Sequence, residues 1–314
     1  MTNLVQVEQL YRYYGDQCAV LNVTFTLEKG EILGFLGPNG AGKTSTMQMI
    51  CGNLAPTSGQ ILVNGIDILD RPKEAKRELG YLPEIPPLYR ELTVDEYLQY
   101  CAKLHGLPRG KVRNSLAQAK DRCGLNEVGS RLIGNLSKGY QQRVGIAQAI
   151  LHSPAVIILD EPTVGLDPIQ IREIRELIRE LGKEHGIILS THILPEVQES
   201  CTHVQIIHRG QLVLKDTIEG LEQQMRASSI VLMTRKSPES DKLSALEGVQ
   251  SIEQLDENRL RVFHDKDQNP AESVAEIAVA NGWGLLELIP ERRSMEQIFI
   301  EITRHSPSHE EQDI

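Results

Sequence analysis

Short apolar runs, separated by polar stretches, recur along the first two thirds of the chain. Near the N-terminus, Val23, Phe25 and Leu27 alternate with polar residues, and this period of two predicts half-buried strands at Leu4–Val7 and Cys18–Leu27. Further runs predict strands at Glu31–Leu36, Gln60–Val63, Ala155–Leu159, Gly186–Leu189 and Val204–Ile207. The last three are continuous and β-branched, which is typical of strands buried on both faces.

Helical patterns lie between these strands. A helix is predicted at about Thr44–Cys51, and Thr93 with Glu96 forms a capping box that predicts the start of another. Apolar residues then repeat at helical spacing between Ile171 and Leu181. Strand, helix and strand in succession predict a parallel sheet with right-handed crossovers. The stretch 71–131 is more helical, and we expect a helical insertion at about 84–150.

The pattern changes after about residue 220, where a second domain is expected. Its predicted elements are strand Ile230–Thr234, helix Pro238–Leu246, strands Val249–Leu255 and Arg259–His264, helix Ala271–Asn281, strand Gly284–Ile289 and helix Ser294–Arg304. The order β-α-β-β-α-β, followed by a helix, predicts a small α+β domain of ferredoxin-like type. We therefore predict an α/β domain at 1–220, the accessory domain at 221–305 and a disordered tail at 306–314.

Composition and charge narrow the class of protein. The chain is 40% hydrophobic and 24% charged, as in a globular protein, and its net charge of -10 argues against a protein that coats nucleic acid. Its five cysteines lack metal-ligand spacing, so free thiols in a reducing cytosol are expected. We see no signal peptide and no apolar run near the ~18 residues that span a bilayer. Any membrane connection is therefore expected to come from a partner.

A glycine-rich segment between a predicted strand and a predicted helix carries the first chemical signal. Gly37–Thr44 fits the pattern GxxxxGK[ST], whose backbone N–H groups surround the phosphates of a nucleoside triphosphate. Lys43 is expected to reach the β- and γ-phosphates, and the Thr44 hydroxyl is expected to bind Mg²⁺. The motif alone says only that a nucleoside triphosphate binds.

Two acids and a histidine follow buried strands farther along. Asp160 and Glu161 end the run at Ala155–Leu159, and the ends of parallel strands face the ligand crevice. Asp160 is placed to hold Mg²⁺ and Glu161 to polarise an attacking water. His192, at the end of the next strand, is interpreted as a γ-phosphate sensor. The plainer alternatives are acids that cap a turn and a structural histidine; the phosphate loop upstream favours the catalytic interpretation.

Taken together, these residues resemble the nucleotide-binding subunits of ABC transporters over about Leu4–Leu221. Tyr14 resembles the aromatic residue that stacks on adenine, and Leu136–Tyr140 (LSKGY) resembles the signature sequence. Val164–Asp167 (VGLD) matches the loop that crosses between subunits. The resemblance implies a P-loop ABC cassette with a mixed sheet core, an antiparallel β subdomain and a helical subdomain.

The signature also has a physical interpretation. Ser137 is a good N-cap for a helix running to His152, and Gly139 permits close backbone approach, so the helix start can form a second anion site. The family implies that this site closes on the γ-phosphate bound to the other subunit. Two copies would then bind ATP head to tail.

Two positions depart from the commonest family pattern. Lys138 and Tyr140 replace a glycine and a glutamine of the signature, and Glu84 stands where most members carry glutamine. A carboxylate at Glu84 could contact the Mg²⁺ shell, but with a different charge. Both departures, with the segment Tyr81–Val94, are similar to the type-2 exporter branch that includes gliding-motility-type and multidrug-type ATPases. The end of this chain also resembles the C-terminal extension of that branch, for which two roles are open: support of the dimer or regulation.

These observations define the predicted site. The nucleotide-binding residues are Tyr14, Gly37, Pro38, Asn39, Gly40, Ala41, Gly42, Lys43, Thr44, Ser45, Glu84, Ser137, Gly139 and Asp167. The catalytic residues are Lys43, Glu161 and His192, and the Mg²⁺ ligands are Thr44, Glu84 and Asp160. ATP and Mg²⁺ are the expected cofactors.

The function implied is an ATPase that dimerises, as a homodimer, on ATP and drives a separate membrane permease, with export as the direction. It would lie peripherally on the cytoplasmic face of the cell membrane and bind no nucleic acid. Two alternatives are a soluble ABC ATPase acting on ribosomes or DNA, and a module that binds ATP without turnover. The single phosphate loop and acidic charge disfavour the first, and intact Lys43, Asp160, Glu161 and His192 disfavour the second.

Overall fold

The computed structural model describes residues 3–224, 229–265, 268–291 and 297 of the 314 residues. Its contacts separate two units, the first ending at Ile218 and the second beginning at Glu219. Each unit has hydrophobic core residues of its own. The predicted helix Ser294–Arg304 and the predicted tail 306–314 lie outside the described residues, apart from the single position 297.

An antiparallel sheet opens the first unit. Its strands are β1 (Asn3–Tyr14), β2 (Gln17–Glu28), β4 (Ser58–Val63) and β5 (Ile66–Asp67), in the order β2-β1-β4-β5. The apolar residues of β2 that alternate in sequence are buried at Val23, Phe25 and Leu27. β1 is longer than predicted because its pairing with β2 continues to Tyr14 through several register shifts. Its residues after Val7 are largely exposed. The alternation that marks a half-buried strand is absent there.

A six-stranded sheet forms the centre of the same unit, in the order β10-β9-β3-β8-β7-β6. The strands are β3 (Ile32–Leu36), β6 (Leu79–Leu82), β7 (Val156–Asp160), β8 (Gly186–Thr191), β9 (His203–His208) and β10 (Gln211–Thr217). The predicted parallel arrangement is confirmed for β3, β7, β8 and β9, and every residue of β3, β7 and β8 is buried. β6, which the sequence did not predict, pairs parallel with β7. β10, which the sequence did not predict, pairs antiparallel with β9 at the edge.

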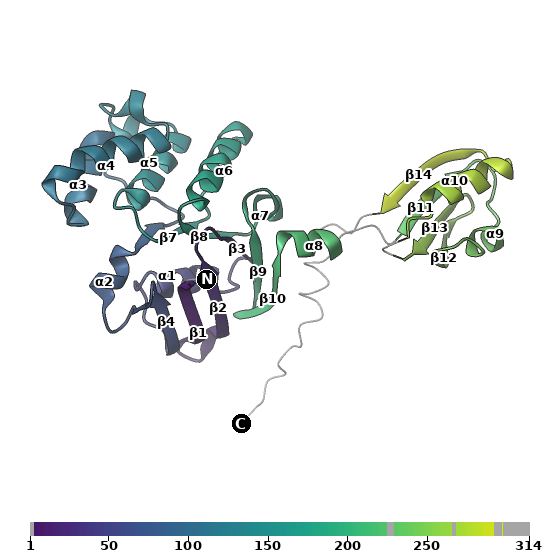
Figure 1. Ribbon diagram of the computed structural model, residues 1–314, viewed down its shortest axis with the longest axis horizontal. Coiled ribbons are helices and arrows are strands. Elements are labelled where there is room, and N and C mark those ends of the chain that lie inside the picture. The colour runs from purple at the N-terminus through teal and green to yellow at the C-terminus, as the bar shows by residue number, and fades with distance from the viewer. Residues whose placement is uncertain (1–2, 225–228, 266–267, 292–296, 298–314) are drawn as a thin grey trace. The chain divides into compact units, whose positions relative to one another are not determined.

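The helices of this unit have the following bounds: α1 (Lys43–Ile50), α2 (Pro72–Arg77), α3 (Val94–Leu104), α4 (Arg109–Arg122), α5 (Lys138–Ile150), α6 (Pro168–Gly182) and α7 (Leu194–Ser200), with 3-10 turns at Asn126–Val128 and Ile133–Asn135. The boundary between the two units falls at the start of α8 (Ile218–Gln224). The predicted capping box is confirmed: Thr93 accepts from the Glu96 amide while the Glu96 carboxylate accepts from the Thr93 amide. α3, α4 and α5 contact one another and form a helical group away from the antiparallel strands (Figure 1).

The second unit has the element order β11 (Ser229–Thr234), α9 (Ser240–Ser244), β12 (Val249–Asp256), β13 (Arg259–His264), α10 (Ala271–Ala280) and β14 (Leu285–Glu291). Its sheet has the order β12-β13-β11-β14, with every neighbouring pair antiparallel. Residues of both helices, Leu243 and Val274, share one core with Leu232 and Leu260 of the sheet. This split βαβ arrangement confirms the predicted ferredoxin-like fold.

Candidate active site

The predicted phosphate loop, Gly37–Thr44, joins the end of β3 to the start of α1. Gly42 is the N-cap of α1 and has a φ of 105°, and a Cβ atom there would lie 2.5 Å from the carbonyl oxygen of Ala19. Only glycine fits this conformation and this close approach to β2. The loop therefore leads directly into a helix N-terminus, where the dipole favours a bound anion.

A cavity of about 440 Å³ opens beside this loop. It is lined by Ala19, Pro38, Asn39, Gly40, Gly42, Lys43, Thr44, Ser45, Glu84, Glu161, Val164 and His192. Except for Ala19 and Val164, every lining residue is one that the sequence predicts for the site. Ala19 has an apolar side chain that gives no signal in the sequence, whereas Val164 begins the VGLD loop that the family resemblance indicated. Gly37 and Ala41 belong to the loop but do not line the cavity.

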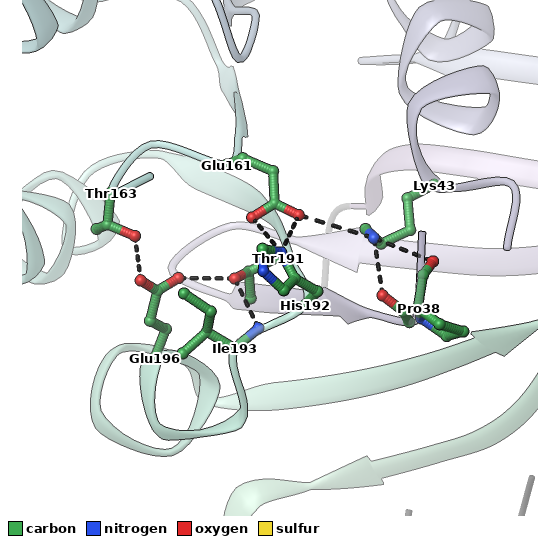
Figure 2. Close-up of polar contacts among 9 residues, drawn as sticks. Pro38, Lys43, Glu161, Thr163, Thr191, His192, Ile193 and Glu196 are labelled. Atoms are coloured by element: carbon green, nitrogen blue, oxygen red, sulfur yellow. Dashed lines mark hydrogen bonds and ion pairs between the residues drawn. The ribbon is translucent and has the colours of Figure 1, made fainter. Parts of the chain in front are cut away.

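The ammonium group of Lys43 is held inside the loop. Its Nζ donates to the carbonyl oxygens of Gly37 at 2.7 Å and Pro38 at 3.3 Å, and lies 3.7 Å from Glu161 Oε1 (Figure 2). Burial lowers the pKa of Lys43, while the carboxylates of Glu161 and Asp160 act in the opposite direction. A buried cation is thus available at the loop, where phosphate groups would lie.

Glu161 and His192 come from neighbouring parallel strands and face each other. Glu161 directly follows β7, and His192 directly follows β8. His192 Nδ1 lies 2.9 Å from Oε1 and 3.0 Å from Oε2 of Glu161 (Figure 2). Because a carboxylate only accepts, the proton of this contact is on Nδ1. The structure therefore brings the predicted base and the predicted sensor together at one wall of the cavity.

Asp160, the last residue of β7, is buried and is not among the residues that line the cavity. Its Oδ1 has no hydrogen-bond partner among the described residues. Burial raises the pKa of Asp160, against the opposing effect of the Ser190 hydroxyl, and the carboxylates of Glu161 and Glu84 raise it further. A buried carboxylate oxygen without a partner is suited to a divalent cation, and Thr44 and Glu84 add oxygen atoms at the cavity wall. The residues therefore fit Mg²⁺.

Tyr14 lies at the end of β1, next to the phosphate loop helix rather than in the cavity lining. Its hydroxyl is 3.5 Å from the hydroxyl of Ser45, and its ring is partly exposed. The guanidinium carbon of Arg12 lies 4.5 Å from the ring centroid, which is cation–π geometry. Arg12 was not predicted, because a residue two positions away along an irregular strand gives no sequence signal of such a contact.

The signature residues lie apart from the cavity. Ser137 is the N-cap of α5, as predicted, and its hydroxyl accepts from the amide of Tyr140. A Cβ atom on Gly139 would meet the side chain of Gln170 in α6, so this glycine permits close packing between two helices. Asp167 caps α6 by accepting from two amides at 3.0 and 2.9 Å. None of these three lines the cavity.

The geometry defines a class of protein. A glycine-rich loop between a buried strand and a helix, a buried lysine in that loop, and a carboxylate and a histidine at the ends of adjacent parallel strands form the site of a P-loop nucleoside triphosphatase.

Comparison with known proteins identifies the family within this class. Residues 20–164 match the family described as ABC transporter. Over 307 residues the chain is 34% identical to the bacitracin transport ATP-binding protein BcrA of Bacillus licheniformis, covering 96% of this chain and 98% of BcrA. It is 31% identical to the linearmycin resistance ATP-binding protein LnrL of Bacillus subtilis (strain 168), covering 96% and 98%. The chain therefore belongs to the ABC transporter ATP-binding proteins and is an ATPase of that family.

A solved structure agrees with this assignment. The ATP-binding subunit of an ABC transporter is 36% identical, with a TM-score of 0.64, over 70% of this chain and 92% of the other. This confirms the predicted ABC cassette fold. Within the described residues, no helix combines the length and the apolar character needed to cross a bilayer.

Proposed function

We propose that two copies of this chain enclose ATP between them and so drive a separate membrane permease that exports its substrate. The observation that carries the proposal is the separation of the two phosphate-binding elements. Lys43 and Glu161 line the cavity, whereas Ser137 and Gly139 do not. One chain therefore supplies only part of the site, and a second copy, arranged head to tail, would supply a signature.

Within this site each residue has a distinct task. Lys43 and the loop amides bind the β- and γ-phosphates. Glu161 accepts a hydrogen bond from the attacking water and then takes its proton. His192 holds the Glu161 carboxylate in place and contacts the γ-phosphate. Mg²⁺, when bound by Thr44, Asp160 and Glu84, supplies positive charge that offsets the phosphate oxygens. Tyr14 stacks on the adenine.

The permease contact is proposed at the segment that follows Glu84. Glu84 lines the cavity, and the next residue, Ile85, is 82% exposed. Tyr89, in the segment before α3, and Leu104, the last residue of α3, are also exposed. An apolar surface that begins beside a nucleotide contact is suited to transmit nucleotide binding to a membrane protein. Attachment there would place the chain on the cytoplasmic face of the membrane.

Export as the direction rests on the relatives that match almost the whole chain. One is named for bacitracin transport and the other for linearmycin resistance. We extend the direction of transport from these proteins, and not their substrates, because the substrate meets the permease and no residue of this chain has reason to select it.

The test is capture of the complex from membranes. A tagged Glu161→Gln variant, which should hold ATP without hydrolysing it, is purified in detergent with ATP and Mg²⁺, and the proteins recovered are identified by mass spectrometry. A multi-span membrane protein without its own cassette supports the proposal. Lys43→Ala, which should bind ATP about 10–100-fold more weakly, is the matched control for contacts that depend on nucleotide. Recovery of ribosomal or DNA-associated proteins, with no membrane partner, would favour the soluble alternative.

A further inference from the structure

A buried glutamate lies behind the catalytic pair and belongs to none of the motifs. Glu196, on α7, is 2% exposed. Glutamate is almost never fully buried unless its charge is paired or hydrogen-bonded. Glu199 on the same short helix pairs with Arg175 at 2.6 Å, whereas Glu196 has no ion pair within the part of the chain that the structure describes.

Both carboxylate oxygens of Glu196 accept from threonine hydroxyls. The hydroxyl of Thr163 donates to Oε1, and the hydroxyl of Thr191 donates to Oε2 at 2.7 Å (Figure 2). Both threonines are themselves buried. Thr191 Oγ1 also accepts from the amide of Ile193 at 3.1 Å, so it fixes the turn that carries His192. Glu196 therefore joins the turn after β7 to the end of β8 through one side chain.

Those two segments carry the catalytic pair. Thr163 is two residues after Glu161, and Thr191 directly precedes His192. Since His192 Nδ1 contacts Glu161 at 2.9 Å, the chain of contacts closes into a ring: from Glu161 through Thr163, Glu196, Thr191 and His192 back to Glu161. A shift of Glu196 would move both ends of the catalytic contact.

The backbone of Glu161 shows why such a support is needed. Its φ is 50°, in the left-handed region that a residue with a Cβ adopts only at a cost. A conformation of this kind persists when its surroundings hold it. The Glu161 amide donates to the carbonyl of Ser190 at 2.9 Å, which holds the residue on one side. The link between Thr163 and Glu196 holds the turn on the other.

We propose that Glu196 is a positioning residue for ATP hydrolysis, which fixes the separation of Glu161 and His192 through Thr163 and Thr191. Its burial is not explained by stability alone, because a buried carboxyl group without a cation stabilises a fold less than an apolar residue of the same volume. The proposal rests on the roles proposed above for Glu161 and His192.

The test removes the hydroxyl of Thr163 and then restores it. Thr163→Val keeps the shape of the side chain but cannot donate to Glu196, while Thr163→Ser can. We expect kcat for ATP hydrolysis to fall about 10–100-fold in Thr163→Val, with KM for ATP changed less than about 3-fold, because the nucleotide contacts are untouched. Thr163→Ser should recover kcat to within about 2-fold of the wild type.

A second variant addresses the carboxylate directly. Glu196→Gln has the same shape but only one acceptor oxygen, so one of the two threonine hydroxyls loses its acceptor. Its kcat is expected to fall about 10-fold or more at unchanged KM. Thr202→Val is the matched control, because the Thr202 hydroxyl bonds the backbone of Ile32, away from the cavity. It should lower the melting temperature without changing kcat.

The outcomes separate the inference from the function on which it rests. If Thr163→Val and Glu196→Gln keep a normal kcat and only their melting temperatures fall, as in Thr202→Val, the positioning role is overturned. An inactive Glu161→Gln in the same assay would still support Glu161 as the base. Normal kcat in Glu161→Gln would instead overturn the assignment of the base, and the positioning role with it.

Discussion

Lys43 Nζ lies 3.7 Å from Glu161 Oε1, and both side chains are less than a tenth exposed. The cation expected to bind phosphate is thus paired with the carboxylate expected to activate water. Bound phosphate oxygens would replace Glu161 as the ion-pair partner of Lys43, and the Glu161 carboxylate would keep its contact with His192. Nucleotide binding would in this way release the base.

Lys43→Ala is expected to weaken ATP binding about 10–100-fold, because charge-assisted hydrogen bonds to the phosphates contribute about 1.5–3 kcal/mol. Binding is measured by calorimetry with ATP and Mg²⁺. Lys183→Ala is the control, since Lys183 is exposed at the end of α6. Equal affinity in the two variants would contradict the assignment of Lys43.

Glu161→Gln is expected to lower the hydrolysis rate about 10²–10⁴-fold, the range typical of a lost general base. ATP binding should be retained or strengthened, since a negative charge beside the phosphates is removed. Phosphate release and nucleotide retention are measured on the same sample. Glu180→Gln, a change at an exposed position of α6, should leave both at the wild-type level. Hydrolysis at the wild-type rate in Glu161→Gln would show that another group is the base.

Asp160→Asn is expected to raise the Mg²⁺ concentration that gives half-maximal hydrolysis by about 10-fold or more, because the amide oxygen carries no charge. The same change should raise the melting temperature of the metal-free and nucleotide-free protein. Since burial raises the pKa of Asp160, its charged form destabilises the folded state at neutral pH, and asparagine removes that cost. A Mg²⁺ titration and thermal unfolding check the two effects separately.

The stacked imidazoles of His105 and His152, with centroids 3.9 Å apart, predict a loss of stability in acid. Burial and the neighbouring His105 lower the pKa of His152 to about 4. Between that value and the ordinary pKa near 6.5, the unfolded chain binds more protons than the folded one, so the free energy of unfolding falls as the pH is lowered. We expect His152 to account for about 2–3 kcal/mol of loss between pH 7 and 4.

Chemical denaturation at a series of pH values measures this loss. His152→Gln keeps a donor for the carbonyl of Leu79, which His152 Nε2 contacts at 3.0 Å, but it does not titrate. Its stability should therefore depend less steeply on pH than that of the wild type. Identical slopes in the two proteins would rule out His152 as the group responsible.

Local signals predicted much of the fold and of the site. The phosphate loop, the capping box at Thr93 and the cap at Ser137 each depend on residues a few positions apart, and the structure contains all three. The buried strands β7 and β8 are also predictable from the sequence, because both faces of each strand are apolar.

Other features could not be predicted, because they depend on residues that are distant in sequence. β10 has half-buried and exposed residues but no buried one, and it is recognised as a strand only through its pairing with β9. The contact of Thr163 with Glu196 joins positions that are 33 residues apart. A glutamate on a short helix is predicted to be a surface residue unless the packing of the helix is known.

Because of the left-handed backbone at Glu161, the residue that favours ATP hydrolysis at this position is not the residue that favours folding stability. Glycine adopts a φ of 50° without the penalty of about 1 kcal/mol that a residue with a Cβ incurs. A library of variants sorted only for heat resistance should therefore enrich glycine at this position, and every such clone should be a poor ATPase. Sorting the same library for phosphate release should return glutamate.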